Sequence, residues 1–432
     1  MANSTHKLLV ANVEEALPRD DLLFSYYYGE KSAGMFARFL AELHPGDMLV
    51  VPWPLDAGFC GYMDRLIGLG GASDYVVDTG ITDSCLLADA VLVNDRAMGI
   101  LRERCQAPDW RIEAFIETPS IVKLADVLGI PLRGTAAGLV KSGLIDSLND
   151  KLYFKKMAEA AGIPVVPGHA AHNAAELSAE LFGWGLNFDR VMLRKTKYAG
   201  GAGNLAGPAR LLQAQIKDWY NSGTVMIEPF LNITEVAGSL VRISDEGTEF
   251  LGIDRQIFEK GGWCGFTAPF RTPGAEDKYR EFNVEAVREG ALRLAAIAHK
   301  SGARGLMNLD WAFVAGKHGL PLVLECNFRR NGFGYVAEFA RSYFGEGWNK
   351  LALYCRESVP CVFSDFKRLS LRLSEVKWRG EEVLIDGPGA ERGLVITNPP
   401  RAGKASLAIF GPDQHYISEI WETVSPIIKG KP

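Results

Sequence analysis

Two carboxylates, Asp310 and Glu325, stand in the otherwise apolar stretch GLMNLDWAFVAGKHGLPLVLECNFRRNG. A β-hairpin that turns at Lys317 and His318 would place these acids directly opposite each other on neighbouring strands. Like charges in that arrangement destabilise a sheet. A hard cation between them would reverse the effect, and two carboxylates with an amide oxygen suit Mg²⁺, which keeps waters and substrate phosphates as its other ligands. The pattern therefore favours a Mg²⁺ site.

Strict alternation along this hairpin would divide its side chains between two faces. One face would be uniformly apolar and would consist of Leu309, Trp311, Phe313, Leu322, Leu324, Cys326 and Phe328. The other face would collect Asn308, Asp310, Glu325, Asn327 and, further along, Arg329. Two alternatives remain open at this point, namely acids that merely face water and a carboxylate pair for general acid–base catalysis. The neighbouring amide and guanidinium groups favour metal and phosphate binding instead.

This spacing resembles the metal site of the ATP-grasp superfamily, in which an Asp is followed about fifteen residues later by Glu-x-Asn-x-Arg at the ends of paired strands. D-alanine–D-alanine ligase and biotin carboxylase belong to that superfamily. The resemblance implies that Asp310, Glu325 and Asn327 hold Mg²⁺, with two ions expected. It further implies a catalytic Arg329 on the transferred phosphoryl group or the acyl phosphate.

The segment DKLYFKKMAEAAGIPVVPG predicts an amphipathic helix over residues 150–161, with Asp150 near its start and Gly162 and Pro164 ending it. It resembles the superfamily segment that carries the first phosphate-contacting lysine, and this implies that role, and a part in catalysis, for Lys151. The alternative is an ordinary capped helix with a lysine on its surface.

A glycine loop follows in VMLRKTKYAGGAGN, and it resembles the strand and loop that close over the triphosphate of ATP. Gly200, Gly201 and Gly203 would let backbone N–H groups approach phosphate oxygens and would permit the loop to move as a lid. The loop joins two expected strands, so it is not a Walker motif, which would lead into a helix. The alternative is a flexible surface loop.

The basic residues before this loop depart from the superfamily pattern. Arg194 stands where a lysine is usual, and Lys195 and Lys197 follow closely. Arginine can bind phosphate through two N–H groups but is not interchangeable with lysine. Arg194 and Lys195 are both expected at the nucleotide, and which of the three basic residues contacts phosphate stays open.

The segment VMIEPFLNITEV resembles the hinge that binds adenine. The resemblance places Glu228, Phe230 and Leu231 at the adenine edge and Glu235, seven residues after Glu228, at the ribose hydroxyls. The alternative is a strand with two exposed acids. Gln256 is a further candidate for the nucleotide side.

Three groups of elements must position these residues. In the first 120 or so residues, the expected strands KLLVANV, DMLVVPWP and AVLVND alternate with helices near residues 31–44 and at GYMDRLIGL, which predicts a parallel α/β domain. A long helix is expected over residues 281–300, and the strands GLVITN and ASLAIFG with a final helix form a small C-terminal α/β unit. With the resemblance, the chain is predicted as an N-terminal pre-ATP-grasp domain (1–145), an ATP-grasp domain with an α+β core (146–355, with a lid subdomain at about 150–225) and a C-terminal domain (356–432).

Composition excludes several classes of function. The chain of 432 residues is 47% hydrophobic and 23% charged with a net charge of −5, so no broad basic surface for nucleic acid is expected. No apolar run approaches the ~18 residues that span a bilayer, and no signal peptide is evident. Seven cysteines without paired spacing indicate reduced thiols and a cytoplasmic protein.

The function implied by the resemblance is an ATP-dependent ligase that joins a small-molecule carboxylate to an amine through an acyl phosphate. Within the superfamily the chain most resembles amino-acid and peptide ligases of the pheganomycin type, except that RNGFGYVAEFA replaces their Gly-Gly-Thr-Thr-His-Pro after the Arg. A small-molecule kinase and a non-catalytic ATP-binding protein are the alternatives. The identity of both substrates and the formation of a homodimer stay open.

Overall fold

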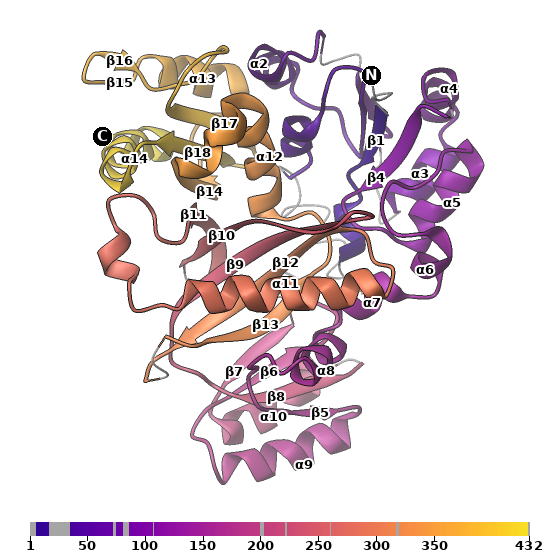
Figure 1. Cartoon of the computed structure of the whole chain (residues 1–432), viewed down its shortest axis with the longest axis vertical. Coiled ribbons are helices and arrows are strands. Elements are labelled where there is room, and N and C mark those ends of the chain that lie inside the picture. The colour runs from indigo at the N-terminus through magenta and orange to yellow at the C-terminus, as the bar shows by residue number, and fades with distance from the viewer. Residues whose placement is uncertain are drawn as a thin grey trace.

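The computed structural model describes residues 6–16, 35–71, 75–80, 86–106, 108–198, 203–220, 223–259, 261–316 and 319–430. Three sheets of four or more strands organise this part of the chain. In Figure 1 the N-terminal sheet lies at the upper right, the largest sheet crosses the middle, and a smaller sheet projects at the bottom.

The N-terminal sheet is parallel, as predicted, with the strand order β3-β2-β1-β4. Its strands are β1 (His6–Val10), β2 (Met48–Val51), β3 (Val76–Asp78) and β4 (Trp110–Ala114). Helical segments in this region are η1 (Val13–Ala16), η3 (Ala37–Glu42), α2 (Ala57–Ile67), α3 (Leu87–Val93), α4 (Asp95–Arg104) and α5 (Pro119–Leu128). The two central strands β1 and β2 are buried on both faces, which accounts for their apolar runs LLV and MLVV, whereas β4 alternates between buried and partly buried residues.

Two expectations for this region are corrected. The segment AVLVND was predicted to be a strand, but its apolar residues lie in α3, where Leu87, Ala88, Ala90 and Val91 are buried on one side. A short apolar run fits a buried helix as well as a strand, and periodicity alone cannot separate the two. Within the predicted helix near residues 31–44, the described part forms the 3₁₀-helix η3, and residues 31–34 lie outside the described part of the chain.

The smaller sheet is antiparallel with the order β5-β8-β6-β7, and its strands lie between residues 169 and 229. Its strands are β5 (His169–Ala171), β6 (Val191–Lys195), β7 (Asn204–Gly207) and β8 (Val225–Pro229). Helices α9 (Ala174–Gly185) and α10 (Ala209–Trp219) cover one face and enclose a separate apolar core. Helices α6 (Ala137–Lys141), α7 (Leu144–Asn149) and α8 (Lys151–Ala160) connect this unit to the N-terminal domain.

The largest sheet has eight strands in the order β13-β12-β9-β10-β11-β14-β18-β17. Its strands are β9 (Ile233–Ser244), β10 (Gly247–Glu259), β11 (Gly262–Ala268), β12 (Gly305–Val314), β13 (Pro321–Asn327), β14 (Ala352–Pro360), β17 (Gly393–Arg401) and β18 (Lys404–Gly411). The long helix α11 (Val284–Lys300) packs against β9 and β10, as Figure 1 shows. The C-terminal strands β17 and β18 therefore continue the sheet that carries the hairpin β12–β13.

The remaining elements are η5 (Glu276–Tyr279), α12 (Gly332–Phe344), η6 (Gly345–Lys350), α13 (Phe366–Ser374), the short pair β15 (Lys377–Trp378) and β16 (Glu381–Glu382), and α14 (Gln414–Lys429). Helix α12 follows the hairpin directly and packs on η3, so it joins the central sheet to the N-terminal domain. Across the part of the chain that the structure covers, every helix is too short or too polar to cross a bilayer.

Candidate active site

The hairpin β12–β13 has the predicted pairing at the acids. Asp310 faces Glu325, and Asn308 faces Asn327. A β-bulge follows, because Trp311 pairs with Val323 and Leu324 has no opposite residue.

The bulge corrects the predicted apolar face of the hairpin. An extra residue reverses the alternation on the bulged strand, so Val323 is buried with Trp311 while Leu322 and Leu324 are only partly buried. The carbonyl oxygen of Leu324, at the bulge, accepts a hydrogen bond from Arg194 Nη1 at 3.3 Å. The guanidinium group of Arg194 thus lies next to the acids.

Glu325 is compensated by cations. Its Oε2 lies 2.5 Å from Arg194 Nη2 and 3.4 Å from Lys151 Nζ. Burial alone would raise the pKa of Glu325, but the charges of Lys151, Arg194 and Arg329 outweigh burial and lower it to about 2. Glu325 is therefore ionised throughout the physiological range.

Asp310 has a different environment. Gln256 Nε2 donates to its Oδ1 at 2.7 Å, Asn308 Nδ2 donates to the same oxygen at 3.1 Å, and Asn327 Nδ2 donates to Oδ2 at 3.1 Å. Burial, followed by the charge of Glu325, raises the pKa of Asp310 to about 7. The repulsion expected between the two acids is thus reduced, because cations contact Glu325 and neutral amides donate hydrogen bonds to Asp310.

These residues fit a divalent ion. Asp310 is a carboxylate whose recorded donors are all neutral amides, and Glu325 and Asn327 flank it on the same hairpin. Within the described ranges, no three or more His, Cys, Asp and Glu side chains gather closely enough to hold a metal by themselves. Mg²⁺ would accordingly depend on the two carboxylates, the Asn327 amide, waters and nucleotide phosphates, which is its usual coordination at phosphoryl-transfer sites.

Lys151 is held by the start of helix α8. Asp150 caps this helix by accepting from the backbone N–H groups of Leu152 and Tyr153. Only 6% of the Lys151 side chain is exposed, and its Nζ also donates to the carbonyl oxygen of Tyr198 at the base of the glycine loop. Burial lowers the pKa of Lys151 and the charge of Glu325 opposes that effect. The alternative of a surface lysine is excluded.

Strand alternation separates the basic residues before the glycine loop. Arg194 lies on the side of Glu325, whereas Lys195 lies on the opposite face, with its Nζ 5.0 Å from the centre of the Trp219 ring. Lys197 lines a cavity next to Lys151. The side chain of Lys195, which was expected at the nucleotide, therefore lies on the other face of β6 from Arg194, while its backbone N–H donates to the carbonyl oxygen of Gly203 at 2.9 Å.

The glycine loop itself is described only in part. Gly200 and Gly201 lie outside the described residues. Gly203 has a φ of +75°, in the left-handed region that favours glycine, and a Cβ added to it would lie 2.8 Å from Tyr198 Cγ. The loop joins β6 and β7, which confirms that it connects two strands.

We expect trypsin cleavage after Lys197 to fall severalfold when a non-hydrolysable ATP analogue and Mg²⁺ are added, because phosphate contacts would hold the lid closed. Gel or mass-spectrometric analysis of limited digests measures this. Cleavage after the exposed Lys367 on α13 is the internal control. Equal protection at both sites would indicate a general effect of nucleotide, and no protection at either would contradict the lid assignment.

The hinge segment contains a second ion-pair group. Glu228 is buried, and its carboxylate lies 3.0 Å from Lys155 Nζ and 3.4 Å from Arg194 Nη1. The Glu228 side chain thus positions Lys155 and Arg194. Contacts with the adenine edge would then come from backbone groups of the residues that follow Glu228. Sequence reasoning missed Lys155, although it follows Lys151 by four residues on one helix face, a spacing that could have indicated a shared site.

Phe230 and Leu231 continue from β8 towards β9. Phe230 is 39% exposed and its ring lies under the guanidinium of Arg190, with the Cζ atom 3.9 Å from the ring centre. Glu235 is partly buried on β9, and its Oε2 lies 4.0 Å from Arg255 Nη1. Burial raises the pKa of Glu235, and Arg255 opposes that effect.

Replacing Glu235 with Ala is expected to raise the KM for ATP with a smaller effect on kcat, because a ribose contact would be equally strong in the ground state and the transition state. Initial-rate kinetics with varied ATP measure the change. Glu249→Ala, on the exposed part of β10, serves as the control. If only the KM for the carboxylate changed, the hinge would be misplaced.

Arg329 lies at the far end of the same face. Its Nη1 donates to Asn149 Oδ1 at 3.1 Å, and Asn149 Oδ1 also accepts from the backbone N–H of Phe328 at 2.9 Å. Helix α7, which ends at Asn149, thereby fixes the chain that follows Asn327. Arg329, Asn327 and Lys151 all line one cavity.

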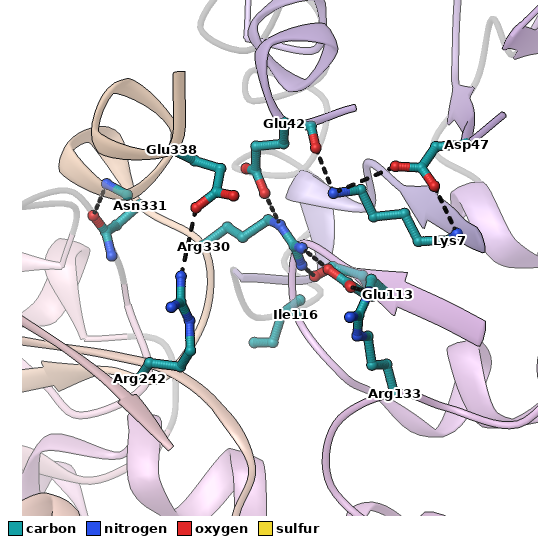
Figure 2. Close-up of polar contacts among 12 residues, drawn as sticks. Lys7, Glu42, Asp47, Glu113, Ile116, Arg133, Arg242, Arg330, Asn331 and Glu338 are labelled. Atoms are coloured by element: carbon teal, nitrogen blue, oxygen red, sulfur yellow. Dashed lines mark hydrogen bonds and ion pairs between the residues drawn. The ribbon is translucent and has the colours of Figure 1, made fainter. Parts of the chain in front are cut away.

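Arg330, which sequence reasoning also missed, anchors this segment to the N-terminal domain. Figure 2 shows its guanidinium between two acids. Its Nε lies 2.7 Å from Glu42 Oε2, and its other nitrogens contact the Glu113 carboxylate and the carbonyl oxygen of Ala114. The side chain is 11% exposed. No local pattern in the sequence signals it, because its partners lie more than 200 residues away.

Asp254 is a third acid near the metal candidates. It lies on β10, two strands from Asp310, and Gly238 pairs with both residues. A Cβ at Gly238 would lie 2.6 Å from Asp254 Oδ2, so this glycine leaves room for the carboxylate. Burial, and then the charge of Asp310, raises the pKa of Asp254 to about 8. A buried acid on a strand that β9 separates from the hairpin could not be placed before the sheet order was known.

Parts of the chain are similar in sequence to known proteins. Residues 36–130 match the family described as the Pre ATP-grasp domain. The arginine-specific large chain of carbamoyl phosphate synthase from Geobacillus stearothermophilus is 28% identical over 220 residues, which is 49% of this chain and 18% of that one. The chain thus spans about a fifth of the length of this relative.

Solved structures match over nearly the whole chain. The N5-carboxyaminoimidazole ribonucleotide synthetase of Thermus thermophilus has a TM-score of 0.56 at 15% identity and covers 99% of both chains. The biotin carboxylase domain of 2-oxoglutarate carboxylase from Hydrogenobacter thermophilus, solved as a dimer with MgADP, ADP and bicarbonate, has a TM-score of 0.62 at 13% identity and covers 99% of this chain and 93% of that one. The chain therefore shares the fold of these ATP-grasp structures, and its residues 36–130 are similar to the Pre ATP-grasp domain.

Proposed function

We propose that this protein is an ADP-forming ligase that activates a carboxylate with ATP and couples it to an amine. The observation that carries the proposal is the difference between the polar partners of the two hairpin acids. Glu325 is held by Arg194 and Lys151, whereas the hydrogen-bond donors to Asp310 among the described residues are the amides of Gln256, Asn308 and Asn327. A metal-bound triphosphate needs such an arrangement, with cations on one side and an uncompensated carboxylate on the other.

The reaction would proceed in two steps. A substrate carboxylate oxygen attacks the γ-phosphorus of ATP, and the bond between this phosphorus and the β-γ bridging oxygen breaks. The products of this step are ADP and an acyl phosphate. The amine nitrogen then attacks the acyl carbon, the C–O bond to phosphate breaks, and an amide and phosphate result after loss of a proton from nitrogen. Phosphate is a far better leaving group than the original oxygen, which is why ATP is required.

The chain's own residues would act mainly through charge. Lys151 and Arg194 would hold the phosphates, Arg329 would contact the transferring phosphoryl group, and Glu325, Asp310 and Asn327 would hold Mg²⁺. Such a metal withdraws charge from the phosphate oxygens during transfer. Because Lys151 and Arg194 are ordered by Glu325 and Glu228 before any ligand arrives, little reorganisation would accompany binding.

Hydroxylamine provides the direct test because it captures acyl phosphates as hydroxamates and does not require the natural amine. The protein is incubated with MgATP, hydroxylamine and a panel of carboxylates that includes amino acids, peptides and bicarbonate. A ligase yields ADP, phosphate and a hydroxamate. A small-molecule kinase yields ADP with a stable phosphorylated product, and a non-catalytic binder yields no turnover with any acid. Either of the last two results would overturn the proposal.

A further inference from the structure

A cavity of about 350 Å³ lies between the N-terminal domain and the candidate phosphate site. Its volume is at the lower end of the range for small-molecule sites. One wall contains Lys151, Lys197 and Arg329, the cations proposed for phosphate and the acyl group. It therefore continues directly from the reaction centre and has room for a small substrate.

The lining of the same cavity also includes acidic and hydroxyl side chains of the N-terminal domain. Glu14 and Glu15 on η1 contribute carboxylates, and Thr118 and Ser120 at the start of α5 contribute hydroxyls. The exposed Asp146 of α7 lines the cavity as well. A cavity lined by both cations and acids is complementary to a molecule that carries both charges.

Glu15 differs from the other acids around the site in its partners. Its Oε1 accepts from Asn12 Nδ2 at 3.0 Å, and both of its oxygens lie 2.7 Å from Ser120 Oγ. Within the part of the chain that the structure describes, these recorded donors are neutral. Glu325, Glu228 and Glu113, by contrast, each have Arg or Lys within 3.4 Å.

An uncompensated carboxylate is costly to hold away from water. Burial raises the pKa of Glu15, and the hydrogen bonds from Ser120 and Asn12 only partly oppose that effect. A cation in the cavity would remove the cost. The Ser120 hydroxyl and the Asn12 amide fix the direction of the carboxylate, so the arrangement can select position as well as charge.

We propose that this cavity binds the carboxylate substrate as a zwitterion, with its carboxylate towards Arg329 and Lys151 and a protonated amine towards Glu15. This inference rests on the proposed ligase function and adds the charge of the substrate to it. A carboxylic acid without the amine would leave Glu15 uncompensated and would be used poorly.

The test compares matched acids and matched variants. Hydroxamate formation is measured with α-amino acids and with their des-amino analogues of the same carbon skeleton, in the parent, in Glu15→Gln and in Glu159→Gln. Glu159 is exposed on α8 and controls for the loss of one negative charge. Because a hydrogen bond to a charged group contributes roughly 1.5–3 kcal/mol, the parent should prefer the best amino acid over its analogue by about 10- to 100-fold in kcat/KM.

Glu15→Gln should lose most of this preference through a higher KM for the amino acid, with the KM for ATP unchanged, and Glu159→Gln should keep it. Equal use of both acids by the parent, or an undiminished preference in Glu15→Gln, would overturn the inference while leaving the ligase function intact.

Thermal melting with MgADP and the same acids tests the opposite case, in which the cavity binds amino acids but the protein is not a ligase. Selective stabilisation by amino acids that depends on Glu15, without hydroxamate, would support the site and contradict the ligase function. A panel in which no amino acid binds or reacts would overturn the inference.

Discussion

Replacing Glu325 with Gln is expected to lower kcat by about 10² or more, since metal charge aligned on the phosphates contributes several kcal/mol to the transition state. Gln keeps the size of the side chain and its hydrogen-bonding capacity but removes the charge that Mg²⁺ requires. Steady-state turnover with saturating ATP measures the effect. Parental turnover in this variant would leave the hairpin acids without a catalytic role.

The stability of the same variant separates two interpretations of the hairpin. From the sequence alone, removing one of two facing acids should leave the metal-free protein at least as stable as the parent. The structure reverses this expectation, because Glu325 is paired with Arg194 and Lys151, and Gln would leave both cations less compensated. We therefore expect a lower melting temperature for the metal-free variant and a much smaller gain on addition of Mg²⁺ and nucleotide.

Replacing Arg330 with Met is expected to lower the free energy of unfolding by about 3–5 kcal/mol, because it leaves Glu42 and Glu113 without their shared cation in partly buried positions. Activity should fall as well, since the backbone of Arg330 also bonds to Phe115 and adjoins Arg329. Urea denaturation measures the first effect. Arg341→Met removes an exposed ion pair with Glu338 on α12 and should change stability by only about 0–1 kcal/mol. Equal effects of the two substitutions would contradict the anchoring role.

The difference in stability between the parent and Arg330→Met should depend on pH in a definite direction. Burial would raise the pKa of Glu113, but Arg330, Lys7 and Arg133 outweigh burial and lower it from 4.5 to about 2. A group with a lowered folded-state pKa stabilises fully above its unfolded value and loses that effect as the pH falls through its folded value. The stability difference between the parent and Arg330→Met should therefore be constant above about pH 5 and shrink between about pH 4.5 and 2.

Local patterns in the sequence were sufficient for the parts of the site that lie on single elements. Asp150 and the apolar spacing after it predicted helix α8 and the position of Lys151 at its start, because capping and helical periodicity involve only nearby residues. The pairing of Asp310 with Glu325 is the one predicted from an assumed turn at Lys317 and His318. Between these acids and that turn, however, the strands pair one residue away from the predicted register, and the bulge makes up the difference.

The same reasoning could not locate the bulge at Leu324, since one extra residue changes neither the composition nor the turn. It consequently assigned Leu322 and Leu324 to the wrong face. It also could not choose between Arg194 and Lys195, which differ only in the face of β6 on which they lie.

Tertiary structure alone decided the partners of the charged groups. The contacts that join segments separated by tens to hundreds of residues include Arg330 with Glu42 and Glu113, and Asp254 near Asp310. Glu15 and Arg329 likewise line one cavity. Such contacts depend on strand order and on the packing of whole domains, which no local period encodes. The sequence therefore determines which chemical groups the chain possesses, and packing determines which of them are compensated and which are left to bind a ligand.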